Sequence, residues 1–238
     1  MNNNRPKITV ITVAFNACKA LMKTMKSIDN QDYPNLEYIV VDGNSADNTV
    51  ENLRAYKGRL DRWVSESDKG IYDAMNKGVA MATGDYCIFM NAGDCFANES
   101  VVSQAVKHFH DNDVIYGDIT KNNKIKASLS PRNCHKMYYC HQAVFTSTNC
   151  LKEFPFDNSH SLSADLKQAK QMFLSGKKFL QLQMVIADFD TGGISNVQRS
   201  KGLWDNIRVV AEVDSFFTKL RLIPRLLFTY LLCKVRKK

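Results

Sequence analysis

The chain has 238 residues, of which 45% are apolar and 24% are charged. These fractions are typical of globular domains and exclude a disordered chain, a coiled coil and a polytopic membrane protein. Eleven glycines and five prolines are too few for a collagen-like or low-complexity chain. Seven cysteines, an odd number without a CxxC pair, favour reduced thiols over a disulfide framework.

The net charge of +8 is concentrated at the C-terminus. Residues 199–238 contain ten Lys or Arg and three acidic residues, a net charge of 10 − 3 = +7. The other residues carry 22 basic and 21 acidic groups, a net charge of +1. A nearly neutral body with a basic tail suggests an anionic partner surface. The N-terminus shows no apolar leader, so we expect no signal peptide.

Strand-like and helix-like segments alternate along the first 118 residues. The pattern predicts strands over 8–15, 36–42, 60–65, 86–91 and 114–117. It predicts helices over 18–30, 46–56, 71–82 and 100–110, with Ser45 capping the second. This order predicts an α/β fold with a mostly parallel central sheet and helices on both faces.

The rest of the chain is less regular. It predicts a polar turn over 121–126, strands over 142–147 and 178–187, and a helix over 163–174. We therefore expect one domain over residues 1–198 and a C-terminal helical, basic segment over 199–238.

Polar residues stand at the expected carboxyl ends of three strands: Asn16, Asp42, and Asn91 with Asp94. Parallel sheets bind ligands at this edge. The chain has neither a GxGxxG nor a GxxxxGK[ST] motif, which disfavours a dinucleotide oxidoreductase and a P-loop enzyme. Side chains and a metal would therefore have to hold a nucleotide.

Four ordered segments, ITVITVAFN, YIVVDGNSADNT, DKGIYDAMNKG and ATGDYCIFMNAGD, resemble glycosyltransferase family 2. Members of this family are inverting enzymes with the GT-A, Rossmann-like fold. The resemblance covers residues 6–118, the implied nucleotide-binding half. It continues more weakly through HQAVF, SADL and GGIS in the implied acceptor half, about 119–198.

The resemblance implies a role for most polar residues of these motifs. The implied nucleotide-binding residues are Ala14, Phe15, Asn16, Asp42, Asp68 and Asn91. The implied donor or acceptor pocket contains Gly70, Tyr72, Asn76, His141, Gln142 and Gly193. Two simpler interpretations stay open: Phe15 as core, and Tyr72–Val79 as a packed helix face.

The resemblance places the family's acidic metal motif at Asn91–Asp94. Since Asn91 carries no charge, Asp94 is expected to be the only protein carboxylate on Mn²⁺ or Mg²⁺. Such a cation neutralises the charge that develops on a leaving diphosphate.

Asp165 matches the family's catalytic base, which takes the proton of the acceptor hydroxyl. Its position in the first turn of a helix favours the ionised form. Alternatively, Asp165 only complements the helix dipole, with Ser163 as cap and Asp157 as the base. A zinc site at Cys134, His135, Cys140 and His141 is disfavoured by the ligand spacing.

The C-terminal residues 220–238 are both apolar and basic. They predict a short helix over Leu226–Val235, begun by Pro224 and lying on an anionic membrane surface. A helix docked on the body is the alternative, and no nucleic-acid partner is expected.

The predicted function is inverting transfer of a sugar from a UDP-linked donor to a hydroxyl of a glycan or lipid-linked glycan in surface polysaccharide assembly. We expect a cytoplasmic protein on the inner membrane face. A nucleotidyltransferase-like enzyme and an inactive nucleotide-sugar-binding protein are the alternatives.

Overall fold

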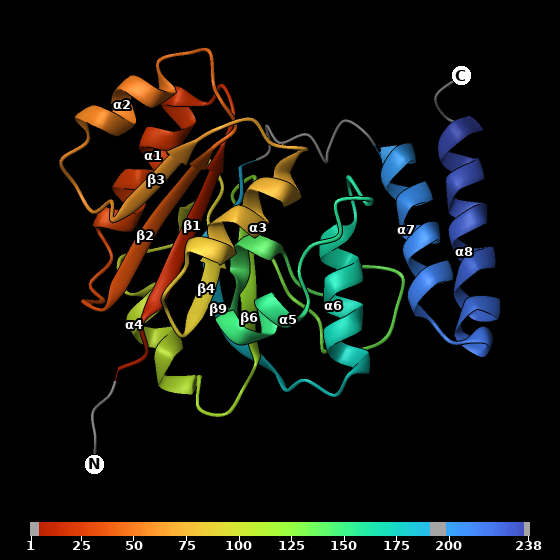
Figure 1. The fold of residues 1–238 in the computed structure, drawn as a ribbon. Coiled ribbons are helices and arrows are strands. Elements are labelled where there is room, and N and C mark those ends of the chain that lie inside the picture. The colour runs from red at the N-terminus through yellow and green to blue at the C-terminus, as the bar shows by residue number, and fades with distance from the viewer. Residues whose placement is uncertain (1–4, 191–198, 236–238) are drawn as a thin grey trace.

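One mixed sheet organises residues 5–190 and 199–235, which this computed structural model describes (Figure 1). The strands are β1 (Ile8–Ala14), β2 (Leu36–Asp42), β3 (Arg62–Ser65), β4 (Tyr86–Phe89), β5 (Cys95–Phe96), β6 (Val114–Lys121), β7 (Lys124–Lys126), β8 (Val144–Ser147) and β9 (Phe179–Asp188). Their order is β3-β2-β1-β4-β8-β6-β9-β5, and β7 pairs with β6.

The predicted α/β fold with a mostly parallel sheet is confirmed. Strands β3, β2, β1 and β4 are parallel neighbours, and β6 and β9 run in the same direction. Strand β8 enters between β4 and β6 in the opposite direction. This insertion matters for the site, because it returns the chain to the carboxyl end of β4.

Helices cover both faces of the sheet (Figure 1). These helices are α1 (Cys18–Asp29), α2 (Thr49–Ala55), α3 (Ile71–Met81), α4 (Val101–Ala105), α5 (Thr148–Glu153) and α6 (Ala164–Leu174), with the 3₁₀ turns η1 (Val106–His108) and η2 (His141–Ala143). Helices α7 (Arg199–Val213) and α8 (Phe216–Val235) lie beyond α6, where α7 packs on α6 and α8 on α7 (Figure 1).

Two apolar clusters form the core, one on each face. Along β1, Ile8 and Val10 join the cluster that contains α1 and α4. The alternate residues Ile11 and Val13 join the cluster with α3, α5 and α6. This two-residue alternation is the side-chain period of a strand, and it explains why every residue of β1 is buried.

The structure departs from the sequence predictions at two turns. Helix α2 begins only at Thr49, after Asn48, so Ser45 is not its cap. The predicted turn over 121–126 is a β6–β7 hairpin whose central residues, Asn122 and Asn123, have φ of 51° and 58°. Asparagine tolerates this left-handed conformation, which matches the twist of a tight hairpin.

The C-terminal segment is a helical hairpin. Helix α8 packs along α7, with Ile207 and Val210 against Leu222 and Leu226. The prediction that Pro224 begins the helix is wrong, because α8 runs unbroken through it. Packing of α8 on α7 offsets the hydrogen bond that proline cannot donate.

Buried polar contacts join α7 to α6. Lys170, in α6, lies 2.9 Å from the carboxylate of Asp214, just after α7, and both side chains are buried. His160, before α6, lies 2.8 Å from Asp205 of α7. The hairpin is therefore fixed to the body at α6, as the docked-helix alternative predicts. No helix of the described residues is long and apolar enough to cross a bilayer.

Candidate functional site

Predicted residues from β1, β2 and the segment after β3 converge at the carboxyl edge of the sheet. Phe15 follows β1, and its ring is 65% exposed, so the core interpretation is wrong. A Cβ on Gly43 would lie 2.6 Å from Asp68 Oδ2 and 3.3 Å from Phe15 Cδ2. Because Gly43 has no side chain, an aromatic ring and a carboxylate can border the same space.

Asp42 is fully buried at the end of β2. Its Oδ2 accepts hydrogen bonds from the Ser45 N–H at 2.9 Å and the Ser65 hydroxyl at 2.6 Å. Asn16 accepts one from the Ala46 N–H at 2.8 Å, and its own N–H donates to the Ser45 hydroxyl at 2.7 Å. Asp42 and Asn16 thus shape the loop after β2, and their contact with a nucleotide stays a prediction.

The Asn91–Asp94 turn follows β4, and α1 supports it. The Thr24 hydroxyl donates to the Asp94 carbonyl at 2.8 Å and accepts the Gly93 N–H at 2.9 Å. The Asp94 carboxylate is buried, and burial raises its pKa, although the Asp190 N–H donates to its Oδ1 at 2.8 Å. A cation beside this carboxylate would offset its desolvation.

The surroundings of this turn fit a divalent cation. The Asn91 Oδ1 is buried and has no hydrogen-bond partner among the described residues. The Asp190 carboxylate borders the same turn, since a Cβ on Gly93 would lie 2.5 Å from it. Asp94, Asp190 and Asn91 therefore offer the oxygen ligands that Mg²⁺ and Mn²⁺ prefer. The sequence analysis missed Asp190, which pairing of β5 with β9 brings here.

A chain of polar contacts leads from this turn to Asp165. The Asn91 Nδ2 lies 2.9 Å from His141 Nε2, and His141 Nδ1 lies 3.8 Å from Asp165 Oδ2. The Tyr72 hydroxyl donates to Asp165 Oδ1 at 3.1 Å. Burial and the Asp165 carboxylate raise the pKa of Tyr72 well above its usual range, so that it remains a donor. Four predicted site residues are thus in contact.

Asp165 occupies the first turn of α6, and its side chain is one-fifth exposed. Ser163 stands at the N-cap of this helix, as predicted, but its side chain makes no capping hydrogen bond. The Ser163 hydroxyl donates to Asn206 of α7 at 2.6 Å instead. Ser163, two residues before Asp165, therefore ties the segment that carries the candidate base to the C-terminal hairpin.

Asp157, the second candidate base, is already paired. The Lys167 ammonium lies 2.6 Å from the carboxylates of Asp157 and Glu212, and this hydrogen bond lowers the pKa of Asp157. Asp157, His160 and Glu212 have the spacing of metal ligands. Because the Lys167 ammonium already pairs with both carboxylates, this cluster is an ion-pair network between α6 and α7 and a poor cation site.

Two predicted pocket residues have structural partners. Gly70, with φ of 118°, precedes α3, and its N–H donates to Asp68 at 2.8 Å. The Asn76 amide donates to the Phe156 carbonyl at 2.8 Å and accepts the Phe156 N–H at 3.0 Å. The Asn76 amide therefore fixes the backbone of Phe156, and the Phe156 ring stacks on that of Tyr72.

The other predicted residues lie as follows. Ala14 is buried at the end of β1. Gln142 is buried beside His141, and its Oε1 has no partner among the described residues. Gly193 lies outside the described residues.

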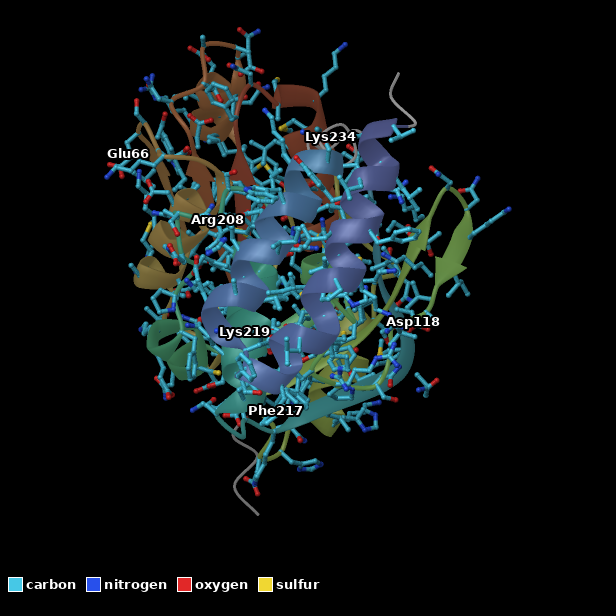
Figure 2. The ribbon with its side chains drawn as sticks, turned by 90° about the vertical axis from the view of Figure 1, so that its right-hand side faces the viewer. Glu66, Asp118, Arg208, Phe217, Lys219 and Lys234 are labelled. Carbon is cyan, nitrogen blue, oxygen red and sulfur yellow. The ribbon has the colours of Figure 1, made fainter. Side chains whose placement is uncertain are left out.

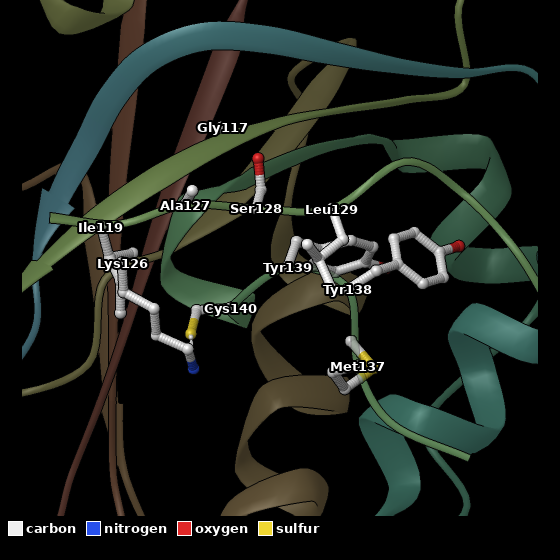
Figure 3. Close-up of a pocket in the computed structure, with 10 residues that line it drawn as sticks. All are labelled: Gly117, Ile119, Lys126, Ala127, Ser128, Leu129, Met137, Tyr138, Tyr139 and Cys140. Carbon is white, nitrogen blue, oxygen red and sulfur yellow. Dashed lines mark hydrogen bonds between the residues drawn. The ribbon is translucent and has the colours of Figure 1, made fainter. Parts of the chain in front are cut away.

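A small cavity lies between β6, the strand-like segment 126–129 and residues 137–140 (Figure 3). Tyr138 and Tyr139 border it, and the Lys126 ammonium lies 3.6 Å from the Cys140 thiol. Its volume of about 60 Å³ accommodates a few water molecules. This cavity is too small for a nucleotide-sugar.

Comparisons with known proteins define the family of this chain. The model of "Glycosyl transferase family 2" matches residues 9–174. The chain therefore belongs to glycosyl transferase family 2.

Three relatives illustrate the range of the family. An uncharacterized glycosyltransferase of Mycobacterium tuberculosis is 29% identical, over 87% of this chain and 84% of its own. A PGL/p-HBAD biosynthesis glycosyltransferase of Mycobacterium bovis is 26% identical, over 80% of each chain. A Campylobacter jejuni GalNAc(5)-diNAcBac-PP-undecaprenol beta-1,3-glucosyltransferase is 38% identical, over 37% of this chain and 30% of its own.

Solved structures confirm the fold. The structure of Staphylococcus aureus TarS in complex with UDP has a TM-score of 0.69 at 18% identity, over 93% of this chain and 70% of that one. A mannosyltransferase from Pyrobaculum calidifontis in complex with GDP-Man and Mn²⁺ has a TM-score of 0.70 at 19% identity, over 88% and 64%.

Proposed function

We propose that this glycosyltransferase moves a sugar from a UDP-linked donor to a hydroxyl of a lipid-linked glycan, with inversion at the anomeric carbon. The contact chain Asn91–His141–Asp165 carries the proposal, because it joins the oxygen-rich turn to a partly exposed carboxylate. The nucleotide-sugar would lie along the sheet edge between them.

The nucleotide half of the site rests on the exposed ring of Phe15 and the Asp68 carboxylate, which border one space across Gly43. An exposed aromatic ring offers a surface on which a base stacks. Asp42 and Asn16 then set the loop that faces the base. The UDP complex of TarS, which shares the fold, supports the choice of probe.

Asp94, Asp190 and Asn91 would hold Mn²⁺ or Mg²⁺. When bound, this cation neutralises negative charge on the departing diphosphate. Asp94 is buried, so the same carboxylate without a cation would oppose an approaching phosphate.

Asp165 takes the proton of the acceptor hydroxyl while the acceptor oxygen attacks the anomeric carbon. The bond from that carbon to the diphosphate oxygen breaks, and the nucleoside diphosphate leaves with the electron pair. The Tyr72 hydroxyl donates to Asp165 Oδ1 and His141 lies 3.8 Å from Oδ2, which orients the carboxylate.

Helix α8 supports the membrane part of the proposal. Its face away from α7 carries an apolar stripe, consisting of the exposed side chains of Phe216, Phe217, Leu220, Leu227, Phe228, Leu231 and Val235. Basic residues flank the stripe, and α8 contains no acidic residue. This combination suits the surface of an anionic bilayer, on the inner face of the membrane.

Metal-dependent nucleotide binding is tested by adding UDP and Mn²⁺ to the parent protein and to Asp94→Ala, and following the melting temperature. UDP should raise the parent's melting temperature only with Mn²⁺, and it should do so far less in the variant. Equal stabilisation of both proteins would contradict the metal assignment. Failure of a nucleotide-sugar panel to give transfer or hydrolysis would favour the inactive binding protein.

The membrane part is tested with Phe217→Ser/Phe228→Ser and anionic vesicles. Both rings are exposed, at 80% and 66%, so the variant should fold and sediment less with vesicles. Removing 220–238, which the sequence alone would allow, is unsuitable because Leu222 and Leu226 cover α7. Parental co-sedimentation of the double variant would contradict the membrane contact.

A further inference from the structure

A second, larger cavity lies between α7, α8 and the loop before α6. Its volume is about 380 Å³, within the range of small-ligand sites. We call it the α7–α8 groove, bordered by Lys201, Trp204, Asp205 and Arg208 of α7 and by Tyr230 and Lys234 of α8. Figure 2 shows α7 and α8 side by side on this face, with Arg208 and Lys234 on them.

The groove is cationic. Three basic side chains border it, against one carboxylate, that of Asp205. The Asp205 oxygens are already occupied: Oδ1 lies 2.8 Å from His160 Nδ1 and 3.2 Å from Arg208, and Oδ2 accepts the Leu162 N–H at 3.1 Å. Lys201 and Lys234 are exposed. The groove therefore attracts an anion, and phosphate oxygens match lysine and arginine donors.

Two aromatic rings give the groove an apolar side. Trp204 is half-exposed, and its ring centroid lies 5.6 Å from that of Tyr230. The Lys234 ammonium lies 5.1 Å from the Tyr230 centroid. Tryptophan and tyrosine next to lysine are typical of the boundary between headgroups and acyl chains. The next residues along α8 after Tyr230 and Lys234, which are Leu231 and Val235, belong to the apolar stripe.

The loop before α6 connects the groove to the candidate base. Ser161 and Leu162 border it, and the chain reaches Asp165 three residues later. The Leu162 N–H binds Asp205, and the Ser163 hydroxyl binds Asn206, so the same loop joins groove and base. A ligand whose phosphate occupied the groove could extend its glycan towards Asp165.

We infer that the α7–α8 groove binds the diphosphate of a lipid-linked acceptor, with the lipid chain along α8. This inference deepens the proposed function and rests on it for the acceptor's role. The predicted ligand class is an isoprenoid or other long-chain lipid that carries a diphosphate.

The probe is farnesyl diphosphate, a short isoprenoid diphosphate, and the signal is Trp204 fluorescence. The chain has two tryptophans, so Trp63→Phe leaves Trp204 as the only tryptophan, which is excited selectively over the tyrosines. Titration should give saturable binding. Lys201→Gln/Lys234→Gln should weaken it at least about tenfold, because it removes two of the three cations that border the groove.

Lys57→Gln/Lys124→Gln is the matched control, because it removes two exposed lysines elsewhere. It should bind the probe within about twofold of the parent. Equal binding by the parent and the Lys201/Lys234 variant would overturn the groove assignment. Equal affinity for inorganic diphosphate would overturn the lipid part, and equal affinity for farnesol would overturn the phosphate part.

Competition separates this inference from the proposed function. UDP with Mn²⁺ should not displace the probe, and it should stabilise the Lys201/Lys234 variant as it does the parent. Displacement by UDP would place the probe at the sheet edge and overturn the groove. If UDP with Mn²⁺ fails to bind the parent while the probe binds, the proposed function fails and the groove stands.

Discussion

Replacing Asp165 by Asn is the sharpest test of the proposed chemistry. Asparagine keeps the size of the side chain, and its carbonyl oxygen can still accept the Tyr72 hydroxyl and the Leu166 N–H. We therefore expect a change of about 1 kcal/mol or less in the free energy of unfolding. The amide cannot take the acceptor proton, so kcat should fall by about 10²–10⁴.

The assay is steady-state transfer from the donor that the nucleotide-sugar screen identifies, with the donor KM measured in parallel. The donor KM should change little, because Asp165 lies on helix α6, whereas the proposed nucleotide-binding residues lie at the strand ends. Asp157→Asn is the matched control, and it should keep most of kcat because Lys167 already pairs with that carboxylate. Near-parental kcat in Asp165→Asn, or an equal loss in Asp157→Asn, would refute the assignment.

Two further predictions concern Gly43 and Glu37. Gly43→Ala should weaken UDP binding, measured by calorimetry, because the new Cβ lies 2.6 Å from Asp68 and must displace it. Unchanged UDP affinity would contradict the placement of the nucleotide beside Gly43. Burial opposes ionisation of Glu37, but hydrogen bonds from Thr83 and Thr9 outweigh it and lower the pKa to about 2, against 4.5. The Glu37 carboxylate therefore stabilises the fold above pH 4.5, and this stability is lost as pH falls towards 2. Glu37→Gln should lower the free energy of unfolding by about 3 kcal/mol at pH 7. Urea unfolding at several pH values should then show a smaller loss of stability between pH 4.5 and 2 than in the parent. An equal loss in parent and variant would contradict this.

The α/β alternation of the first half was readable from local patterns. Buried parallel strands are apolar throughout, and the connecting segments have helical spacing, so both periods appear in the sequence. The polar residues Asn16, Asp42 and Asn91 follow strands, and the strand direction alone placed them at one edge. The tail was harder, because packing of α8 on α7 decides that Pro224 lies inside a helix.

The sequence by itself determined the fold class, the sheet edge at which polar residues gather, and the family resemblance, because these depend on short-range periodicity and contiguous motifs. Only the tertiary structure decided how the site closes. Strand β8 pairs antiparallel with β4, and this pairing brings His141 to Asn91, 50 residues away. Pairing of β5 with β9 brings Asp190 to Asp94, 96 residues away. Such contacts depend on long-range register, which no local pattern specifies.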